Sequence, residues 1–245
     1  MKYDYIEQGE GEVIVLLHGL MGAVSNFSNT IKALPKHGYR VILPMLPIYK
    51  LPILKTNVNE LASFVNNFAE DIGIDKFTVL GNSLGGHIGL ILALRHPNKV
   101  SKLILSGSSG LYENTLGGTF PKRGSYSYIE TKTQEVFFKP ESATKELVDE
   151  VFETVNNRER VIRVVMMAKS AMRTNMKKEL PKITQKTCII WGKQDKITPP
   201  EVGREFNSDI PNSEIFWIDK CGHAPMIEQP EEFNNLLVSW LKQQI

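Results

Sequence analysis

Short apolar runs alternate with amphipathic patterns along most of this chain, and the alternation restricts the folds open to it. Six runs rich in Val, Ile and Leu have strand length but no in/out alternation, as strands buried on both faces do. They lie at 12–19, 39–45, 77–82, 102–108, 187–193 and 214–219. Helical spacing of apolar residues is visible at 57–73 and 84–97, and a last helix is expected from Pro230 onward. This order predicts βαβ units, hence a parallel sheet covered by helices.

The stretch 111–181 interrupts this pattern. It begins with a Gly-rich polar segment, continues with helical patterns at 141–157 and 159–172, and shows no convincing strand. Because loops of this length without structure are uncommon, we predict a helical cap of residues 111–181 on a core domain of residues 1–110 and 182–245. The cap should cover the carboxyl edge of the sheet, where open α/β sheets bind ligands. Five aromatics could line its inner face or form its own small core: Phe120, Tyr126, Tyr128, Phe137 and Phe138.

A serine set between glycines is the sharpest chemical signal. The segment Gly81-Asn82-Ser83-Leu84-Gly85 joins a predicted strand to a predicted helix. A tight strand–turn–helix junction needs small residues two positions either side of the serine, and it lifts the hydroxyl above the sheet. Ser83 is therefore the candidate nucleophile. The alternative is an incidental serine in a Gly-rich turn.

A serine hydroxyl needs a base to accept its proton. Of the five histidines, only His223 lies in a Gly-flanked loop directly after a predicted strand. Asp195 follows the preceding strand and is the candidate carboxylate that orients this histidine. The chain order Ser, Asp, His is the one found with a nucleophile elbow. Asp195 as an ordinary turn residue is the alternative.

An oxyanion hole would complete such a site. One backbone N–H is expected from Leu84, directly after the serine, and the second from Leu20, in the turn after the run at 12–19. Gly19 and Asn82 are further candidates for contact with a substrate.

Composition argues against several partners. The 29 basic and 27 acidic side chains give a net charge of +2 and are interspersed, unlike the basic face of a nucleic-acid binder. No apolar run reaches the length of a membrane span, and the polar amino terminus lacks a signal-peptide core. Cys188 and Cys221 have no metal-binding or redox spacing. We expect a cytoplasmic protein with a small-molecule substrate and with no metal, cofactor, nucleic-acid or membrane partner. A homo-oligomer remains open.

Four motifs, taken in order, resemble the α/β-hydrolase superfamily over essentially the whole chain. They are HG at 18–19, GNSLGG at 81–86, GKQDKITP at 192–199 and CGHAPMIEQPEEF at 221–233. The resemblance implies an α/β-hydrolase fold with an eight-stranded, mostly parallel sheet, whose first strands come from residues 2–17, and a mobile helical cap.

Within the superfamily, GNSLGG resembles the meta-cleavage product hydrolases, which hydrolyse C–C bonds in vinylogous diketones. Two features differ from that family. Ala224 stands where it usually carries a tryptophan, and its cap arginine would fall near Val151, with Arg158, Arg160 and Arg163 as candidates to replace it.

Ester hydrolysis through an acyl-enzyme is the function we expect from these residues. Hydrolysis of a C–C bond with the same triad is the main alternative, and cofactor-free haloperoxidase chemistry also remains open. A non-catalytic small-molecule receptor on this fold is a further alternative. A dehalogenase is disfavoured because its nucleophile would be an aspartate at the position of Ser83.

Overall fold

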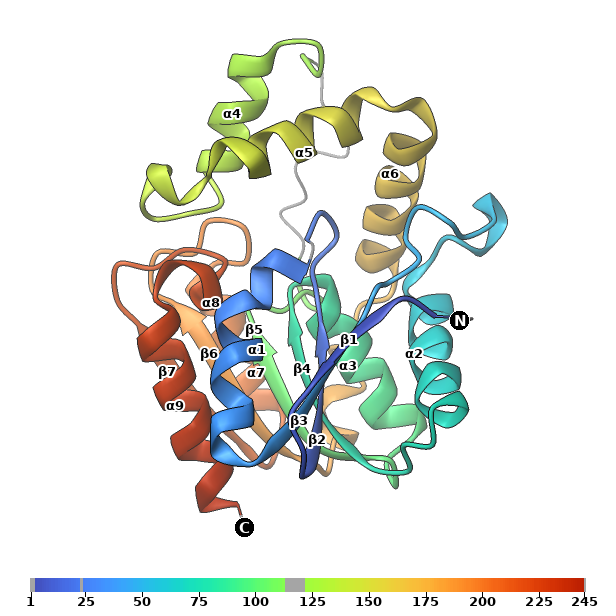
Figure 1. Cartoon of the computed structure of the whole chain (residues 1–245), viewed down its shortest axis with the longest axis vertical. Helices are drawn as coiled ribbons and strands as arrows, with labels where there is room; N and C mark the ends of the chain where they lie inside the picture. Colours follow the sequence, from blue (N-terminus) through green and yellow to red (C-terminus); the bar gives the residue numbers. More distant parts are fainter. Residues whose placement is uncertain (1–2, 23, 113–121, 245) are drawn as a thin grey trace.

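The computed structural model describes residues 3–22, 24–112 and 122–244. Its strands form one sheet in the order β1-β3-β2-β4-β5-β6-β7. The strands are β1 (Tyr5–Gln8), β2 (Glu12–Leu17), β3 (Tyr39–Pro44), β4 (Phe77–Asn82), β5 (Val100–Ser106), β6 (Lys186–Gly192) and β7 (Ser213–Ile218). Only β1 is antiparallel to its neighbour, so β2 to β7 end at one common edge, the upper edge in Figure 1.

The structure confirms an α/β-hydrolase fold with a mostly parallel sheet, and all six predicted strands are present. The expected number of eight strands is wrong: the described residues form seven. Ahead of β2 the described residues form the four-residue β1 and a turn with Gly9 and Gly11 at positive φ.

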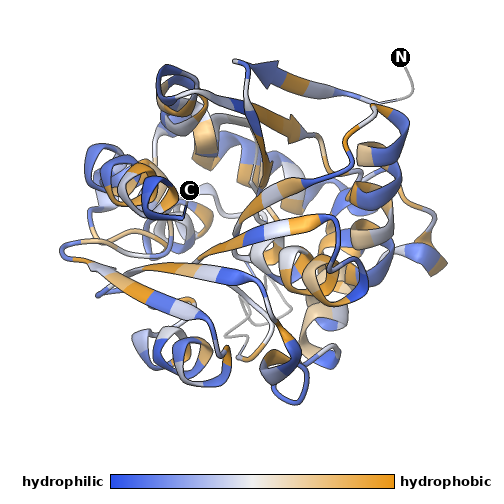
Figure 2. Cartoon of the chain, turned by 90° about the horizontal axis from the view of Figure 1, so that it is seen from below, coloured by the Kyte–Doolittle hydropathy of each residue, from blue (hydrophilic) through white to orange (hydrophobic). Residues whose placement is uncertain are grey.

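Helices cover both faces of the sheet, which explains why the strands read as unbroken apolar runs. One apolar cluster joins Val15 and Leu17 of β2 to α2 (Val58–Asp71), α3 (Leu84–Arg95) and α7 (Pro200–Asp209). A second joins the alternate residues of β2, Ile14 and Leu16, to α1 (Ser28–Ala33) and α9 (Pro230–Gln243). Figure 2 shows the apolar residues of the strands lying between these layers.

Short helical turns link the main elements. They are η1 (Val24–Phe27), η2 (Leu34–His37), η3 (Ile53–Lys55), η4 (Pro140–Ser142), η5 (Leu180–Lys182) and the four-residue α8 (Pro225–Glu228). Among the described residues, none of the helices combines the length and apolarity needed to cross a bilayer.

Three helices between β5 and β6 lie above the carboxyl edge of the sheet in Figure 1. We call them the cap helices: α4 (Tyr126–Gln134), α5 (Lys145–Asn156) and α6 (Arg158–Arg173). The patterns at 141–157 and 159–172 anticipated α5 and α6. The α4 sequence, YSYIETKTQ, has too few apolar residues to show a helical period, so α4 was not anticipated. Treating residues 111–181 as a separate domain stays a prediction.

The cap helices have a small core of their own and are attached to the elements around the sheet. Ile129, Val151, Val155 and Val161 form that core, with Tyr128 packed against it. At the end near α2, Ser170 Oγ accepts the backbone N–H of Val58 at 3.1 Å. The five aromatics considered above for the cap do not share one role.

Tyr128 belongs to the cap core, and the Tyr126 ring packs on Phe152 with centroids 5.3 Å apart. Phe137 lines the pocket described below, and Phe138 is exposed. Phe120 lies outside the described residues.

Candidate active site

Ser83 occupies a strained turn between β4 and α3. Its backbone φ is +53°, a value that residues other than glycine rarely adopt. A Cβ added at Gly81 would lie 2.3 Å from the carbonyl carbon of Gly85, and one at Gly85 would lie 1.9 Å from the Leu17 oxygen. Only glycine fits at either position, which gives the G-x-S-x-G pattern its physical reason here.

His223 and Asp195 come together at the ends of β7 and β6. The two atoms His223 Nδ1 and Asp195 Oδ2 are 2.9 Å apart, and the side chains are 9% and 0% exposed. The Asp195 carboxylate can only accept a hydrogen bond, so His223 Nδ1 carries the proton that it donates. Nε2 is then the unprotonated, basic nitrogen of the ring. The sequence prediction of these two residues as partners therefore agrees with the geometry of the pair.

The Asp195 carboxylate is fully provided with donors. Oδ1 accepts the backbone N–H groups of Ile197 at 2.8 Å and Thr198 at 2.9 Å. Oδ2 accepts the Thr198 hydroxyl at 2.8 Å, in addition to the imidazole. A buried carboxylate bonded in this way cannot rotate freely, so it holds the imidazole in one orientation.

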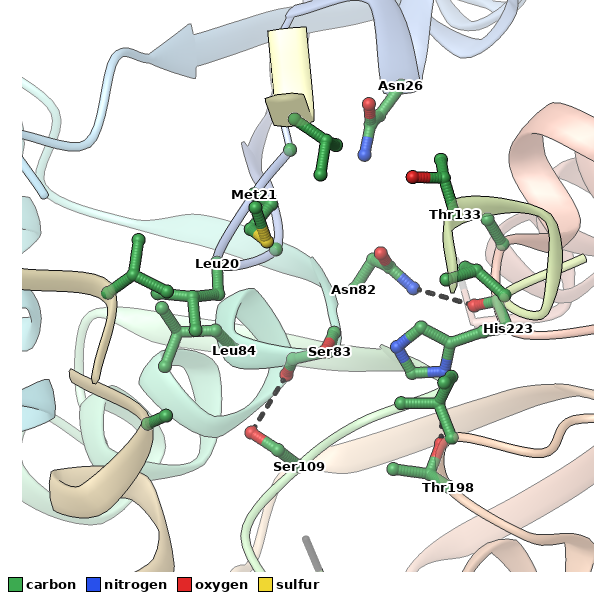
Figure 3. A pocket seen from close by; sticks show the side chains of 18 of the residues that line it. Leu20, Met21, Asn26, Asn82, Ser83, Leu84, Ser109, Thr133, Thr198 and His223 are labelled. Atoms are coloured by element: carbon green, nitrogen blue, oxygen red, sulfur yellow. Dashed lines mark hydrogen bonds between the residues drawn. The ribbon is translucent and has the colours of Figure 1, made fainter. Parts of the chain in front are cut away.

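Ser83 and His223 both line one pocket, beneath the cap helices, with a volume of about 200 Å³. Figure 3 shows the imidazole between Ser83 and Thr198. Thr198, whose hydroxyl donates to Asp195, lines the pocket as well. Ser83, His223 and Thr198 therefore converge at the base of this pocket.

The two predicted oxyanion donors also lie at this base. Leu84 is the first residue of α3, and the first N–H groups of a helix have no partner within it. Leu20 lies in a turn closed by a hydrogen bond from Gly22 N to Gly19 O at 3.1 Å. A Cβ at Gly19 would lie 3.4 Å from Ser83 Cβ, so this turn packs directly against the nucleophile. Gly19, Leu20 and Leu84 all line the pocket.

His18 supports this turn, a role that the sequence did not indicate. Its Nδ1 lies 2.9 Å from the Gly19 oxygen, and its Nε2 accepts the Leu46 N–H at 3.3 Å. Burial lowers the pKa of His18 below its usual value, which favours the neutral ring that both contacts require.

Asn82 lines the pocket, as expected of a substrate contact. Its side-chain amide also bridges the end of β5 and the loop that carries His223. Nδ2 donates to the carbonyl oxygens of Ser106 at 2.9 Å and His223 at 3.1 Å. The latter bond, drawn in Figure 3, ties the strand that leads to Ser83 to the histidine loop. Contact of Asn82 or Gly19 with a substrate stays a prediction.

The upper walls of the pocket are mainly aliphatic and come from the cap helices. They are formed by Leu147, Val151, Val164, Val165, Ala168 and Ala171. Asn26, Lys132 and Thr133 add polar groups that sequence reasoning missed, and Figure 3 shows Asn26 and Thr133 at the same end of the pocket. Among the described lining residues, Lys132 is the one permanently charged side chain, and its ammonium is 2.6 Å from Glu135.

The arginines considered as carboxylate ligands do not line this pocket in the described part of the chain. Arg163 donates to the carbonyl oxygens of Leu51 and Glu159, each at 3.0 Å. Arg160 lies over the ring of Tyr49, 5.6 Å from its centroid. Within the described ranges no group of His, Cys, Asp and Glu side chains is arranged to hold a metal ion.

Replacing Thr198 with valine is expected to lower kcat about tenfold, because a hydrogen bond to a charged group is worth about 1.5–3 kcal/mol. The change removes a donor to Asp195 Oδ2 and a hydroxyl that lies 3.2 Å from His223 Nδ1. Steady-state kinetics on an activated ester would measure the loss. The matched control is Thr131→Val, since the Thr131 hydroxyl donates to Ser127 O of its own helix at 2.9 Å and Thr131 is not among the described lining residues. Equal rates in both variants would contradict a role for Thr198.

Comparisons with known proteins show which family the chain resembles over most of its length. Residues 12–230 match the family model described as alpha/beta hydrolase fold. A 2-hydroxy-6-oxononadienedioate/2-hydroxy-6-oxononatrienedioate hydrolase from Pseudomonas sp is 29% identical, with 96% of this chain and 90% of that protein covered. This similarity to C–C bond hydrolases agrees with the resemblance seen in the GNSLGG motif.

Two solved structures extend the comparison. An α/β hydrolase enzyme from a metagenome of lagoon sediments at Mar Chica, Morocco, is 43% identical, with a TM-score of 0.83 and coverage of 100% of this chain and 96% of that one. An esterase from Exiguobacterium antarcticum is 25% identical, with a TM-score of 0.83 and coverage of 98% and 95%. On the family match over most of its length, this chain belongs to the α/β-hydrolase fold family.

Proposed function

We propose that this protein is a serine hydrolase in which Ser83 is the nucleophile, His223 the general base and Asp195 the residue that orients the base. The observation that carries the proposal is the buried Asp195–His223 pair at the base of the pocket lined by the strained Ser83. A serine, a base and an orienting acid in these positions are the elements of nucleophilic acyl transfer.

In the proposed reaction Ser83 Oγ attacks a carbonyl carbon while His223 Nε2 accepts its proton. The backbone N–H groups of Leu20 and Leu84 bind the resulting oxyanion. His223 then gives the proton to the leaving group, which departs as an alcohol or as a protonated carbon. Water attacks the acyl carbon with His223 again as base, and Ser83 is released with the acid product.

Hydrolysis of a C–C bond next to a ketone is the reaction that the comparisons favour. The relative from Pseudomonas sp is named for a substrate that carries carboxylates. Lys132 is the lining cation that such a carboxylate could reach, because none of the three candidate arginines, Arg158, Arg160 and Arg163, is among the described lining residues. We therefore place an acidic substrate's carboxylate at Lys132 if the chain cleaves C–C bonds.

Ester hydrolysis is the second candidate, and the pocket itself favours it. Its cap walls are aliphatic, and the lining cation Lys132 already has Glu135 as partner. The acyl chain of a neutral ester, if short or medium in length, would pack against these aliphatic walls and would need no cation to bind it. The established similarity to an esterase of this fold supports the same class.

A substrate panel distinguishes the two reactions. Nitrophenyl esters of graded acyl length would be compared with a 2-hydroxy-6-oxo dienoate by kcat/KM. A larger kcat/KM on the dienoate supports C–C hydrolysis, and a larger value on the esters supports the second candidate. Stoichiometric labelling of Ser83 by a fluorophosphonate would accompany either result. Absence of labelling in folded protein would instead favour a non-catalytic receptor.

Replacing Lys132 with methionine gives a sharper test of the C–C reaction. Loss of one charged hydrogen bond should lower kcat/KM on the dienoate by about tenfold to a hundredfold and leave neutral esters nearly unchanged. The control is Lys145→Met, which removes an exposed lysine that pairs with Asp149 on α5. Equal losses on both substrates would contradict a carboxylate contact at Lys132.

A further inference from the structure

The loop that carries His223 is held from two sides. On one side Gln194 and Cys221 exchange two hydrogen bonds: Gln194 N donates to Cys221 O, and Cys221 N to Gln194 Oε1, each at 3.0 Å. On the other side the loop touches the segment 136–139, which follows α4. There the backbone N–H of His223 donates to Val136 O at 2.9 Å. The loop of the proposed base thus rests directly on a segment that leads out of the cap helices.

One carboxylate joins these two segments. Glu228, at the end of α8, accepts the Gly222 N–H at its Oε1 (2.7 Å). Its Oε2 accepts the N–H groups of Phe138 at 2.7 Å and Lys139 at 3.4 Å. We call this set of four residues the Glu228 clasp. It connects Gly222, the residue immediately before His223, with Phe138, which lies 90 positions before Glu228.

The clasp uses a carboxylate in an unusual setting. Burial raises the pKa of Glu228, and the backbone N–H groups that it accepts oppose this rise. Its hydrogen-bond partners in the described part of the chain are those N–H groups and the Cys221 thiol, with Sγ 3.8 Å away. Burying part of a charge costs free energy unless hydrogen bonds compensate for the lost water. The backbone N–H groups of the two segments supply these hydrogen bonds to Glu228, so we explain the presence of a carboxylate here by the segments it joins.

The two segments are packed too closely to move independently. A Cβ added at Gly222 would lie 2.6 Å from Val136 O and 2.9 Å from Phe138 N. Val136 and Phe137 line the same pocket as His223. A shift of either segment would therefore displace the imidazole and the pocket wall together.

We propose that Glu228 is a positioning residue for His223, which fixes the imidazole relative to Ser83 and to the Val136–Phe137 wall by clasping the two segments. This inference rests on the proposed role of His223 as general base. Displacement of a reacting group by about 1 Å can cost about a hundredfold in rate, so a loosened loop should slow the first chemical step.

The test compares Glu228→Gln with the unaltered enzyme. The amide keeps the size of the side chain, but its NH₂ cannot accept, so either Gly222 or Phe138 and Lys139 lose their acceptor. We expect the rate constant for fluorophosphonate labelling of Ser83, and kcat on a short nitrophenyl ester, to fall about tenfold or more while KM changes little. The low-field proton NMR signal of His223 Nδ1–H should broaden, because its ring is less firmly held.

The matched control is Gln229→Ala, one residue along. Gln229 Nε2 donates to Lys220 O at 3.3 Å, on the same loop but at its outer end. This variant should label, turn over and give the NMR signal as the unaltered enzyme does. A loss of rate equal to that of Glu228→Gln would show a general loosening of the loop and would overturn the proposal.

The outcomes separate this proposal from the proposed function. If the folded, unaltered protein fails to label at Ser83, the proposed function fails. If it labels, and a folded Glu228→Gln variant labels at the same rate with an unchanged NMR signal, only the clasp fails. Should that variant not fold, amide hydrogen exchange of the unaltered protein decides. Slow exchange of the Gly222 and Phe138 amides through one common opening supports the clasp, and fast exchange of either amide overturns it.

Discussion

Replacing Ser83 with alanine is expected to lower kcat by about a million-fold, the scale of loss known when a triad serine is removed from a serine protease. Such a loss corresponds to about 8 kcal/mol of transition-state free energy. The reason is that the covalent step disappears: the methyl group cannot attack, and His223 has no hydroxyl to deprotonate. Residual hydrolysis would come from the pocket and the oxyanion donors acting on bound water.

Single-turnover kinetics and mass spectrometry of the fluorophosphonate adduct would measure this effect. Alanine is as small as serine and would adopt the same strained φ in this turn. The thermal unfolding temperature of the variant should therefore change little. The control is Ser109→Ala, because Ser109 lines the same pocket and its Oγ lies 3.3 Å from the Ser83 carbonyl oxygen. Activity within tenfold of normal in Ser83→Ala would mean that another nucleophile does the chemistry.

Replacing Asp195 with asparagine is expected to lower kcat by about ten-thousand-fold, as the corresponding change does in a serine protease. An amide NH₂ facing Nδ1 cannot accept its proton. The imidazole would then change tautomer and present Nε2–H to Ser83, so it could no longer act as a base. The backbone donors of Ile197 and Thr198 at Oδ1 hold the side chain in place, and folding should be preserved.

The pH dependence of kcat and the thermal unfolding of this variant would be measured together. Asp219→Asn is the matched control, since Asp219 is an exposed acid near His223 in sequence whose Oδ1 accepts only Gln194 Nε2 at 3.1 Å among the side-chain bonds described. Near-normal turnover in Asp195→Asn would show that a different carboxylate orients the histidine.

The elbow and the strands could be read from the sequence because each depends on neighbours in the chain. Gly81 is required by contacts with Gly85 and Gly86 within the turn itself, so this part of the pattern is local; Gly85 is required by its packing against Leu17 of β2. The unbroken apolar runs follow from burial on both faces of the sheet. The wrong count of eight strands came from the family resemblance; the apolar runs predicted six strands, and the described residues add β1 to these.

The position of Asp195 and His223 after consecutive strands was also readable, since parallel strands deliver their ends to one edge. Their 2.9 Å contact was not. It depends on how the two loops fold against one another, and on donors such as Thr198 that have no periodic signal.

The sequence alone therefore determined the fold family, the sheet it builds and the three side chains that we propose for the chemistry. Only the tertiary structure decided what surrounds them: Lys132 in the pocket wall, Asn82 on the His223 carbonyl and the Glu228 clasp. Two of these contacts join residues far apart in the chain: Phe138 and Glu228 are 90 positions apart, and Asn82 and His223 are 141 positions apart. Hydrophobic periodicity reports on a residue's own strand or helix, so it cannot show which distant backbone groups a side chain will meet.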